Sequence, residues 1–311
     1  MHADKVGRQR KAVIFALSAV FLWSTVATAF KLTLASVTPF QLVFYASAAS
    51  TLLFAVVLVA QGRLRLLARW SLKNYVRSAL MGLLNPFLYY VVLFSAYARL
   101  LGQEALALNY VWPMVLVLLS IPLLGIRVKF GSFVALLVSF AGVVVIASRG
   151  DLAAFKLSDP LGIVLALGSS LIWAFYWLLN LRDEREDRQR REDRDNVSQL
   201  LANFFFGTLY SFGLALATGL RRPTLAGLAG VVYVGFFEMG LTFLLWLKAL
   251  GETRSPALIS NLVYISPFVS LVFLRFILGE QLLLSTFVGL VLIVGGIGLQ
   301  QIFSQGPRAA Q

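Results

Sequence analysis

The sequence contains no cysteine, and its one histidine, His2, precedes the first apolar segment. Without cysteine there are no disulfides and no thiolate metal sites, so the redox compartment is unreadable. The position of His2 excludes a histidine proton relay inside a membrane and an intramembrane protease of the Ser/His type. We therefore predict neither a metal site nor a cofactor.

Charged residues are also scarce. They make up 13% of the chain, against roughly 25% in soluble domains, while 59% of residues are hydrophobic and the mean hydropathy is +0.83. The formal net charge of +13 comes from basic residues that flank apolar stretches and form no continuous stripe. This pattern favours a lipid bilayer over nucleic acid as the partner of those charges.

Ten apolar segments approach the length of about 20 residues that a helix needs to cross the hydrocarbon core. Charged or turn residues separate them. The segments run over 12–34, 39–60, 75–98, 104–124, 130–148, 160–181, 197–220, 224–247, 255–278 and 283–303. The sequence thus predicts an all-α membrane protein with ten transmembrane helices.

The distribution of basic residues predicts the orientation of these helices. Of the 27 lysines and arginines, twenty fall in the N-terminus, the even loops and the C-terminus, and seven fall on the other side. By the positive-inside rule both termini are cytoplasmic. A cleaved signal peptide is the alternative for the N-terminus, because residues 27–29 resemble a processing site. The long first apolar run, with Trp23 and Phe30, favours a retained helix.

Residues 104–148 match residues 258–302 without a gap at an offset of 154, as in the pairs Tyr110/Tyr264 and Pro113/Pro267. This match predicts a first five-helix repeat over 11–148 and a second over 159–303. Because five is odd, the second repeat enters the membrane from the opposite side, an inverted architecture typical of transporters. The stretch 182–195 has one uncharged residue, Gln189, and is predicted to be a solvated cytoplasmic linker inside the second repeat.

The matched prolines lie near the middle of their helices, where each leaves the carbonyl four residues back, of Asn109 or Val263, without its helical partner. Freed backbone at this depth is tolerated where it lines a cavity or is covered by protein. A packing kink is the simpler alternative, but the symmetry of the pair favours a central binding site.

Aromatic residues with polar tips gather around these prolines. Any one of them could belong to the aromatic belts of the membrane surface, although Trp112, Trp173 and Tyr264 lie too deep for that. Together they suit an apolar or aromatic molecule with a small polar or zwitterionic head. A phosphate-rich substrate is disfavoured, because it would call for Arg or Lys at mid-span and the sequence has none there. The predicted substrate-binding residues are Tyr89, Tyr90, Tyr110, Trp112, Pro113, Trp173, Trp177, Tyr264, Ser266 and Pro267.

Glu238 is a carboxylate near the middle of an apolar segment. Ionisable groups at this depth commonly serve transport, and we regard Glu238 as a candidate for proton coupling. The alternative is a structural carboxyl that is hydrogen-bonded to a neighbour.

The chain resembles the EamA type of the drug/metabolite transporter superfamily from its first helix to its tenth. The resemblance rests on Trp23, the two mid-helix prolines, the turn 278–280 of sequence Leu-Gly-Glu, and Gly289 and Gly296. The run 110–113 of sequence Tyr-Val-Trp-Pro more closely resembles the YddG-like exporters of aromatic amino acids. One departure concerns energy coupling: the position that matches Glu280 in the first repeat is Ile126, where relatives often carry an acidic residue.

The resemblance implies export of amino acids across a bacterial inner membrane by a multi-pass protein with its site between the two halves. We expect alternating access, either uniporter-like or proton-coupled, and a monomer. Another metabolite or drug remains an alternative substrate, because related carriers of nucleotide sugars and triose phosphates share the fold. A channel would need a continuous polar lining. A membrane enzyme would need grouped carboxylates, and Glu104, Glu238 and Glu280 are expected on separate helices at different depths, so we predict no enzyme.

Overall fold

The computed structural model describes all residues except 1, 125–129, 152–158, 187–195, 254–255 and 305–311. The described residues form helices and turns, with no strand among them. In chain order the elements are α1 (His2–Leu34), α2 (Pro39–Ala60), α3 (Arg65–Ala68), α4 (Leu72–Gly82), η1 (Leu83–Leu88), α5 (Tyr89–Arg99), α6 (Gly102–Asn109), α7 (Trp112–Leu124), α8 (Phe130–Ala147), α9 (Pro160–Glu186), α10 (Asn196–Ala217), α11 (Leu225–Tyr233), η3 (Val234–Leu241), α12 (Thr242–Glu252), α13 (Pro256–Asn261), η4 (Leu262–Ile265), α14 (Ser266–Leu278) and α15 (Leu284–Ser304). The predicted all-helical class is confirmed for this part of the chain.

Nine helical stretches of the described chain are long and apolar enough to cross a membrane. They correspond to nine of the ten predicted segments. The remaining prediction, 130–148, coincides with α8, whose apolar stretch Phe133–Ala147 is shorter than the others. The count of ten crossings, the inverted arrangement and the sides of the termini stay predictions. Most of the predicted linker lies outside the described residues, and α9 continues to Glu186.

The chain divides into two compact units. Unit 1 comprises Met1–Phe94 and Asp187–Gly279, and unit 2 comprises Ser95–Glu186 and Glu280–Gln311. Each unit takes helices from both predicted repeats, so the division of the chain by packing differs from the division predicted from the sequence.

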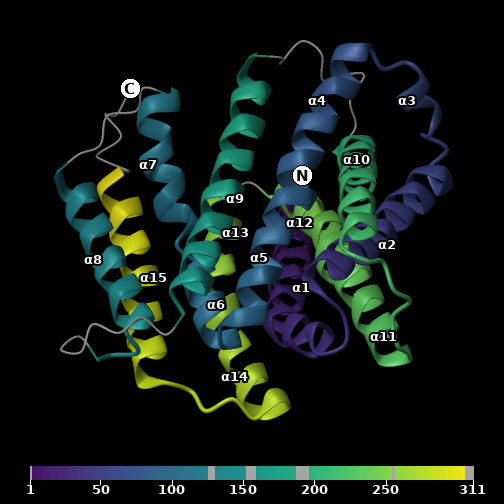
Figure 1. Cartoon of the computed structure of the whole chain (residues 1–311). Helices are drawn as coiled ribbons and strands as arrows, with labels where there is room; N and C mark the ends of the chain where they lie inside the picture. The colour runs from purple at the N-terminus through teal and green to yellow at the C-terminus, as the bar shows by residue number, and fades with distance from the viewer. Residues whose placement is uncertain (1, 125–129, 152–158, 187–195, 254–255, 305–311) are drawn as a thin grey trace. The chain divides into compact units, whose positions relative to one another are not determined.

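In unit 1, small residues let helices approach closely. Ala12, Ala16 and Ala19 recur on one face of α1 and are fully buried. They belong to one core cluster with Trp246 of α12. The ring of Trp23, one turn further along α1, lies 5.1 Å from that of Trp246. α2 packs along α10 (Figure 1), with Thr51 bonded to Thr208 at 3.0 Å.

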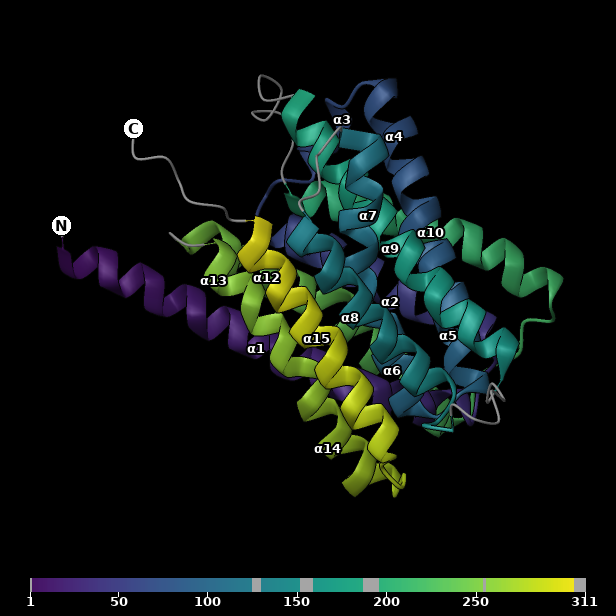
Figure 2. The ribbon, with the colours of Figure 1, turned by 90° about the vertical axis from the view of Figure 1, so that its left-hand side faces the viewer.

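In unit 2, α8 and α15 lie side by side, as both ribbon views show (Figure 2). The contact has glycine on each helix: a side chain on Gly142 would meet the carbonyl of Gly289, and one on Gly296 would meet Ser139. The Ser139 hydroxyl also donates a hydrogen bond to the carbonyl of Ile293, at 3.1 Å. Close backbone approach of this kind is the usual way in which membrane helices associate, since lipid offers no hydrophobic drive.

Several of the apolar helices are interrupted near the middle. The prolines Pro113 and Pro267 were predicted to disrupt the helical hydrogen bonding that precedes them. The α-helix is interrupted at both places, because α6 ends at Asn109 before α7 begins, and the 3₁₀ turn η4 precedes α14. Two further interruptions were not predicted. η1 is a π-helical segment that contains Pro86, and Asn85 there has extended backbone angles of φ −144° and ψ 120°. η3 is a π-helical segment without proline.

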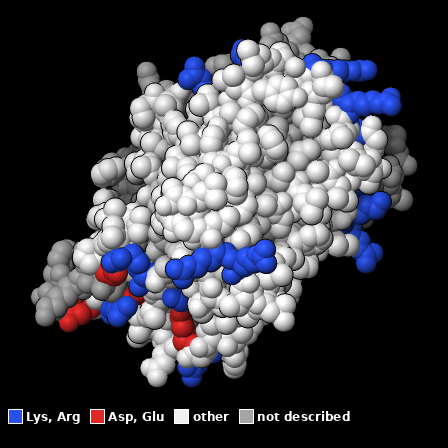
Figure 3. Space-filling view, turned by 45° about the vertical axis from the view of Figure 1, so that its right-hand side comes forward, with Lys and Arg blue, Asp and Glu red and all other residues white. Residues whose placement is uncertain are grey.

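The surface of the described residues is apolar over large areas. Leu225, Phe276 and Leu284 are more than three quarters exposed. Figure 3 shows one face with a broad area that carries neither basic nor acidic side chains. Apolar patches of this extent are rare on soluble monomers and fit a surface that lies against lipid.

Candidate functional site

The two π-helical interruptions are linked by a buried polar pair, Tyr90 and Glu238. Tyr90 is the second residue of α5, which begins where η1 ends, and Glu238 lies inside η3. The Tyr90 hydroxyl lies 3.0 Å from each carboxylate oxygen of Glu238. Tyr90 is 1% exposed and Glu238 is 7% exposed. Because π-helical bulges occur frequently at functional sites, a buried ionisable group inside one of them, bonded to a residue beside the other, is the strongest candidate site in unit 1.

Aromatic rings surround Tyr90. The ring of Tyr89 lies 4.8 Å away and that of Phe94 lies 5.2 Å away, and Phe94 packs edge-on against Phe30 at 4.8 Å. Among the described residues, the Tyr90 hydroxyl is the one hydrogen-bond donor that reaches the Glu238 carboxylate. A carboxylate can accept about four hydrogen bonds, so Glu238 keeps the capacity to bind a proton or a cationic group.

Asn85 is a buried polar residue that the sequence analysis did not select. Its side chain is fully buried, and neither its amide nitrogen nor its amide oxygen has a hydrogen-bond partner among the described residues. The Asn-Pro pair inside an apolar run was the available signal, because the residue before a proline is driven out of the helical region.

The other predicted residues of unit 1 lie on the interrupted helix formed by η4 and α14. Tyr264 is half-buried in η4, and Ser266 and Pro267 are buried at the start of α14. The Ser24 hydroxyl of α1 lies 3.3 Å from that of Ser266. Ser266 therefore contributes to the packing of α1 on α14.

The predicted residues of unit 2 lie on α7, on α9 and at the interruption between α6 and α7. The rings of Trp173 and Trp177 meet edge to face at 5.9 Å. Tyr110 is 9% exposed at the interruption between α6 and α7, followed by half-buried Trp112 and buried Pro113. Within the units, the structure thus brings together Tyr89, Tyr90 and Glu238 in one group and Trp173 and Trp177 in another.

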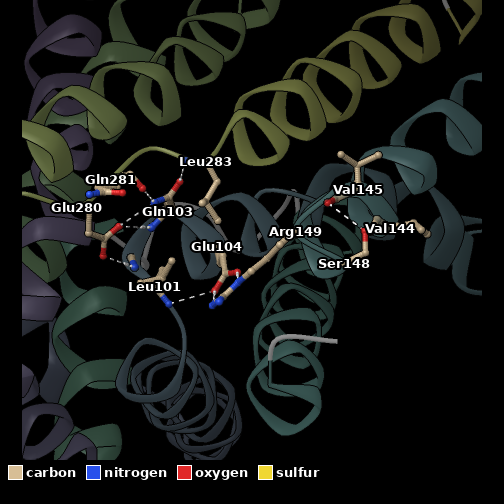
Figure 4. Close-up of polar contacts among 11 residues, drawn as sticks. Leu101, Gln103, Glu104, Val144, Val145, Ser148, Arg149, Glu280, Gln281 and Leu283 are labelled. Atoms are coloured by element: carbon tan, nitrogen blue, oxygen red, sulfur yellow. Dashed lines mark hydrogen bonds and ion pairs between the residues drawn. The ribbon is translucent and has the colours of Figure 1, made fainter. Parts of the chain in front are cut away.

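A second polar cluster, which the sequence analysis missed, lies at the N-terminus of α6 in unit 2 (Figure 4). Arg149 binds Glu104 through two hydrogen bonds, at 2.6 and 3.1 Å, and Glu104 also accepts the backbone N–H of Leu101 at 3.3 Å. Glu104 is 1% exposed, whereas the Arg149 side chain is 47% exposed. The hydrogen bonds that the Arg149 guanidinium donates to Glu104 raise the pKa of Arg149.

Glu280 completes this cluster from the turn before α15. Its carboxylate accepts the backbone N–H groups of Gly102, at 2.7 Å, and of Gln103, at 3.3 Å. The Gln103 side chain donates to the carbonyl of Gln281 and accepts the N–H of Leu283, at 2.8 and 2.9 Å. The first N–H groups of a helix lack intrahelical partners, so these bonds cap α6. We call Gln103, Glu104, Arg149 and Glu280 the polar clamp.

The clamp corrects one expectation. Glu104 and Glu280 were expected at different depths, and this was wrong, because both bind the first turn of α6. The carboxylate oxygens of Glu104 and Glu280 accept hydrogen bonds from the backbone at the start of α6 and from Arg149, so we assign these two residues a structural role. Among the described residues, no group of three His, Cys, Asp or Glu side chains could hold a metal ion.

The long apolar helices, their interruptions and a buried carboxylate inside one of these interruptions define a multi-pass membrane protein of transporter type. The chain belongs to the EamA-like transporter family, whose model matches residues 10–148 and 160–300. The resemblance to that family is therefore confirmed.

Individual relatives are similar along most of their length. An "Uncharacterized transporter" of Archaeoglobus fulgidus is 24% identical and covers 90% of this chain and 93% of its own. The protein PecM of Dickeya dadantii is 26% identical over 75% of each chain. The "Uncharacterized transporter YvbV" of Bacillus subtilis is 26% identical over 83% of this chain and 81% of its own. A solved crystal structure with 24% identity superposes with a TM-score of 0.64, covering 94% of this chain and 97% of the other, and supports the fold.

Proposed function

We propose that the protein exports aromatic and other apolar amino acids across a bacterial inner membrane, as a monomer and by alternating access. The observation that carries this proposal is the buried Tyr90–Glu238 pair between two interrupted helices. A carboxylate with acceptor capacity left can bind the ammonium group of an amino acid, and the neighbouring rings of Tyr89 and Phe94 can contact an apolar body.

The aromatic residues of unit 2 support the same substrate class. Trp173 and Trp177 are half-buried on α9, and Tyr110 and Trp112 lie where the helix is interrupted. We propose that these residues and Pro113 contribute to substrate binding in unit 2, and that Tyr264, Ser266 and Pro267 contribute to it in unit 1. Two inverted repeats would give the inward-open and outward-open states similar energies, which export by alternating access requires.

The test is uptake of labelled phenylalanine, tryptophan, threonine and a phosphosugar into proteoliposomes. We expect the aromatic amino acids to be transported by the intact chain, and Glu238→Gln, Tyr90→Phe and Trp173→Ala to lower that uptake more than tenfold. The matched control is Glu252→Gln, because Glu252 is a partly exposed carboxylate paired with Arg8 at 2.9 Å. Transport of the phosphosugar alone would contradict the substrate class.

Proton coupling through Glu238 is tested in the same vesicles by imposing a pH gradient. A carboxyl that binds and releases a proton in each cycle makes transport respond to the gradient. We expect Glu238→Gln to abolish that response. A variant that still responds as the intact chain does would show that any coupling lies elsewhere.

A further inference from the structure

Unit 1 has a cavity that the proposed transport function does not use. It has a volume of about 270 Å³ and is formed by residues of α3, α4 and α10. Its lining is apolar apart from one tyrosine hydroxyl, and consists of Leu67, Tyr75, Leu201, Ala202, Phe205 and Phe206. Such a lining suits a hydrocarbon ligand.

The position of the cavity along its helices places it near a membrane surface. Leu201 lies five residues after the start of α10, and Phe206 lies ten residues after it, which is about 7 to 15 Å along the helix. Tyr75 lies in the first turn of α4. Both helices belong to stretches that are long and apolar enough to cross a membrane, so we place the cavity just inside the end of the hydrocarbon layer.

Local contacts hold the short helix α3 against α4 beside this cavity. The Tyr75 hydroxyl donates a hydrogen bond to the carbonyl of Leu67 at 2.8 Å, which ties the short helix α3 to α4. The ring of Trp70, 8% exposed, lies 5.6 Å from that of Tyr75. Tyrosine and tryptophan at this depth are typical of the headgroup boundary.

Basic residues flank two of the lining residues in the sequence, and we call Arg65, Arg69 and Lys73 the rim. Arg65 and Arg69 lie two residues to either side of Leu67, Lys73 lies two residues before Tyr75, and all three side chains are exposed. No acidic residue occurs between Lys5 and Gln103 in the sequence. Clusters of basic residues beside a membrane helix attract anionic lipid headgroups, with a contribution of roughly fivefold in affinity for each residue near the surface.

We infer that this cavity and its rim bind an anionic phospholipid. One acyl chain lies against Leu67, Ala202 and Phe205, and the headgroup phosphate is held by Arg65, Arg69 and Lys73. Neither feature alone specifies this ligand. An apolar cavity at the hydrocarbon edge takes any acyl chain, and a basic rim takes any phosphate, so their adjacency selects a lipid that carries both.

The experiment is lipid binding to the purified full chain in detergent, followed by native mass spectrometry. The chain is titrated with phosphatidylglycerol, with phosphatidylcholine of the same acyl chains, and with inorganic phosphate. We expect phosphatidylglycerol to bind at least tenfold more tightly than phosphatidylcholine, and millimolar phosphate not to displace it. Equal binding of the two lipids, or displacement by free phosphate, would overturn the proposal.

Variants separate the rim from the cavity. Arg65→Gln/Arg69→Gln is expected to lower phosphatidylglycerol affinity at least tenfold, and the matched control Arg221→Gln/Arg222→Gln, an exposed basic pair elsewhere in unit 1, to leave it unchanged. Leu67→Trp and Phe205→Trp, which fill the cavity, are each expected to lower binding of both lipids. Phe205 is 49% exposed, so Phe205→Trp is expected to fold. This variant therefore tests whether the lipid binds in the cavity if Leu67→Trp does not fold. An equal loss in the control pair, or full lipid binding by the filled cavity, would show that the lipid does not bind there.

Discussion

Two buried glutamates illustrate two uses of a carboxylate in an apolar protein. Glu104 in unit 2 accepts two hydrogen bonds from Arg149 and one from the backbone of Leu101. Glu238 in unit 1 is met by one neutral donor, the hydroxyl of Tyr90. The two side chains are almost equally buried, at 1% and 7% exposure. Burial therefore does not distinguish them, and the set of partners does.

The difference follows from where each residue lies on its helix. Glu104 is in the first turn of α6, where free N–H groups and the helix dipole favour negative charge, and Arg149 balances that charge. Glu238 lies in the middle of an interrupted helix, where no such donors are provided. A buried charge with a full set of partners stabilises one structure, whereas one with spare capacity can bind and release a ligand.

The largest expected effect is on the clamp. Arg149→Gln leaves Glu104 buried without its counter-charge, and we expect the free energy of unfolding to fall by about 3 kcal/mol. Arg99→Gln is the matched control, because Arg99 pairs with Asp159 at 3.1 Å with both side chains partly exposed, and an exposed pair contributes at most about 1 kcal/mol. Denaturant unfolding in detergent measures both. Equal losses would show that Glu104 does not depend on Arg149.

A smaller loss is expected at the cap of α6. Glu280→Ala removes the acceptor for the N–H groups of Gly102 and Gln103, and we expect a loss of about 1 to 2 kcal/mol. Amide hydrogen exchange should increase at those two residues and stay unchanged in α13, which matches α6 in the predicted second repeat. Unchanged exchange at Gly102 and Gln103 would contradict the role of Glu280 as a cap.

Substitution of Glu238 should affect transport and leave the stability nearly unchanged, in contrast to substitutions in the polar clamp. Glu238→Gln keeps an oxygen that can accept the Tyr90 hydroxyl, and we expect the stability to change by less than about 1 kcal/mol. Transport should nevertheless fall more than tenfold. A large loss of stability with normal transport in the molecules that remain folded would place Glu238 in the same structural class as Glu104.

The smallest effect concerns Asp159, which precedes α9. The backbone N–H of Gly162, donating at 2.9 Å, lowers the pKa of Asp159, and the ion pair with Arg99 lowers it further. A depressed folded-state pKa stabilises the protein above the unfolded pKa, about 4, and this stability is lost as the pH falls through the folded value. Asp159→Asn should reduce the loss of stability between about pH 5 and 3. An unchanged acid profile would show that Asp159 does not contribute.

Much of the fold followed from one-dimensional patterns. Apolar runs of sufficient length predicted the membrane helices, and the prolines at 113 and 267 predicted where two of them are interrupted. The break at Pro86 carried the same signal and was missed, because Pro86 has no matching proline in the repeat register. The π-helical segment around Glu238 has no proline and no comparable local signal.

The sequence by itself determined that the chain lies in a bilayer as apolar helices, because length, hydropathy and proline act locally along the chain. Tertiary structure alone decided which polar groups meet. Arg149 reaches Glu104 across 45 positions, and Glu238 reaches Tyr90 across 148. Such partners are selected by packing between helices, so a carboxylate's role, as a fixed cap or as a binding group, is decided only once its neighbours are in place.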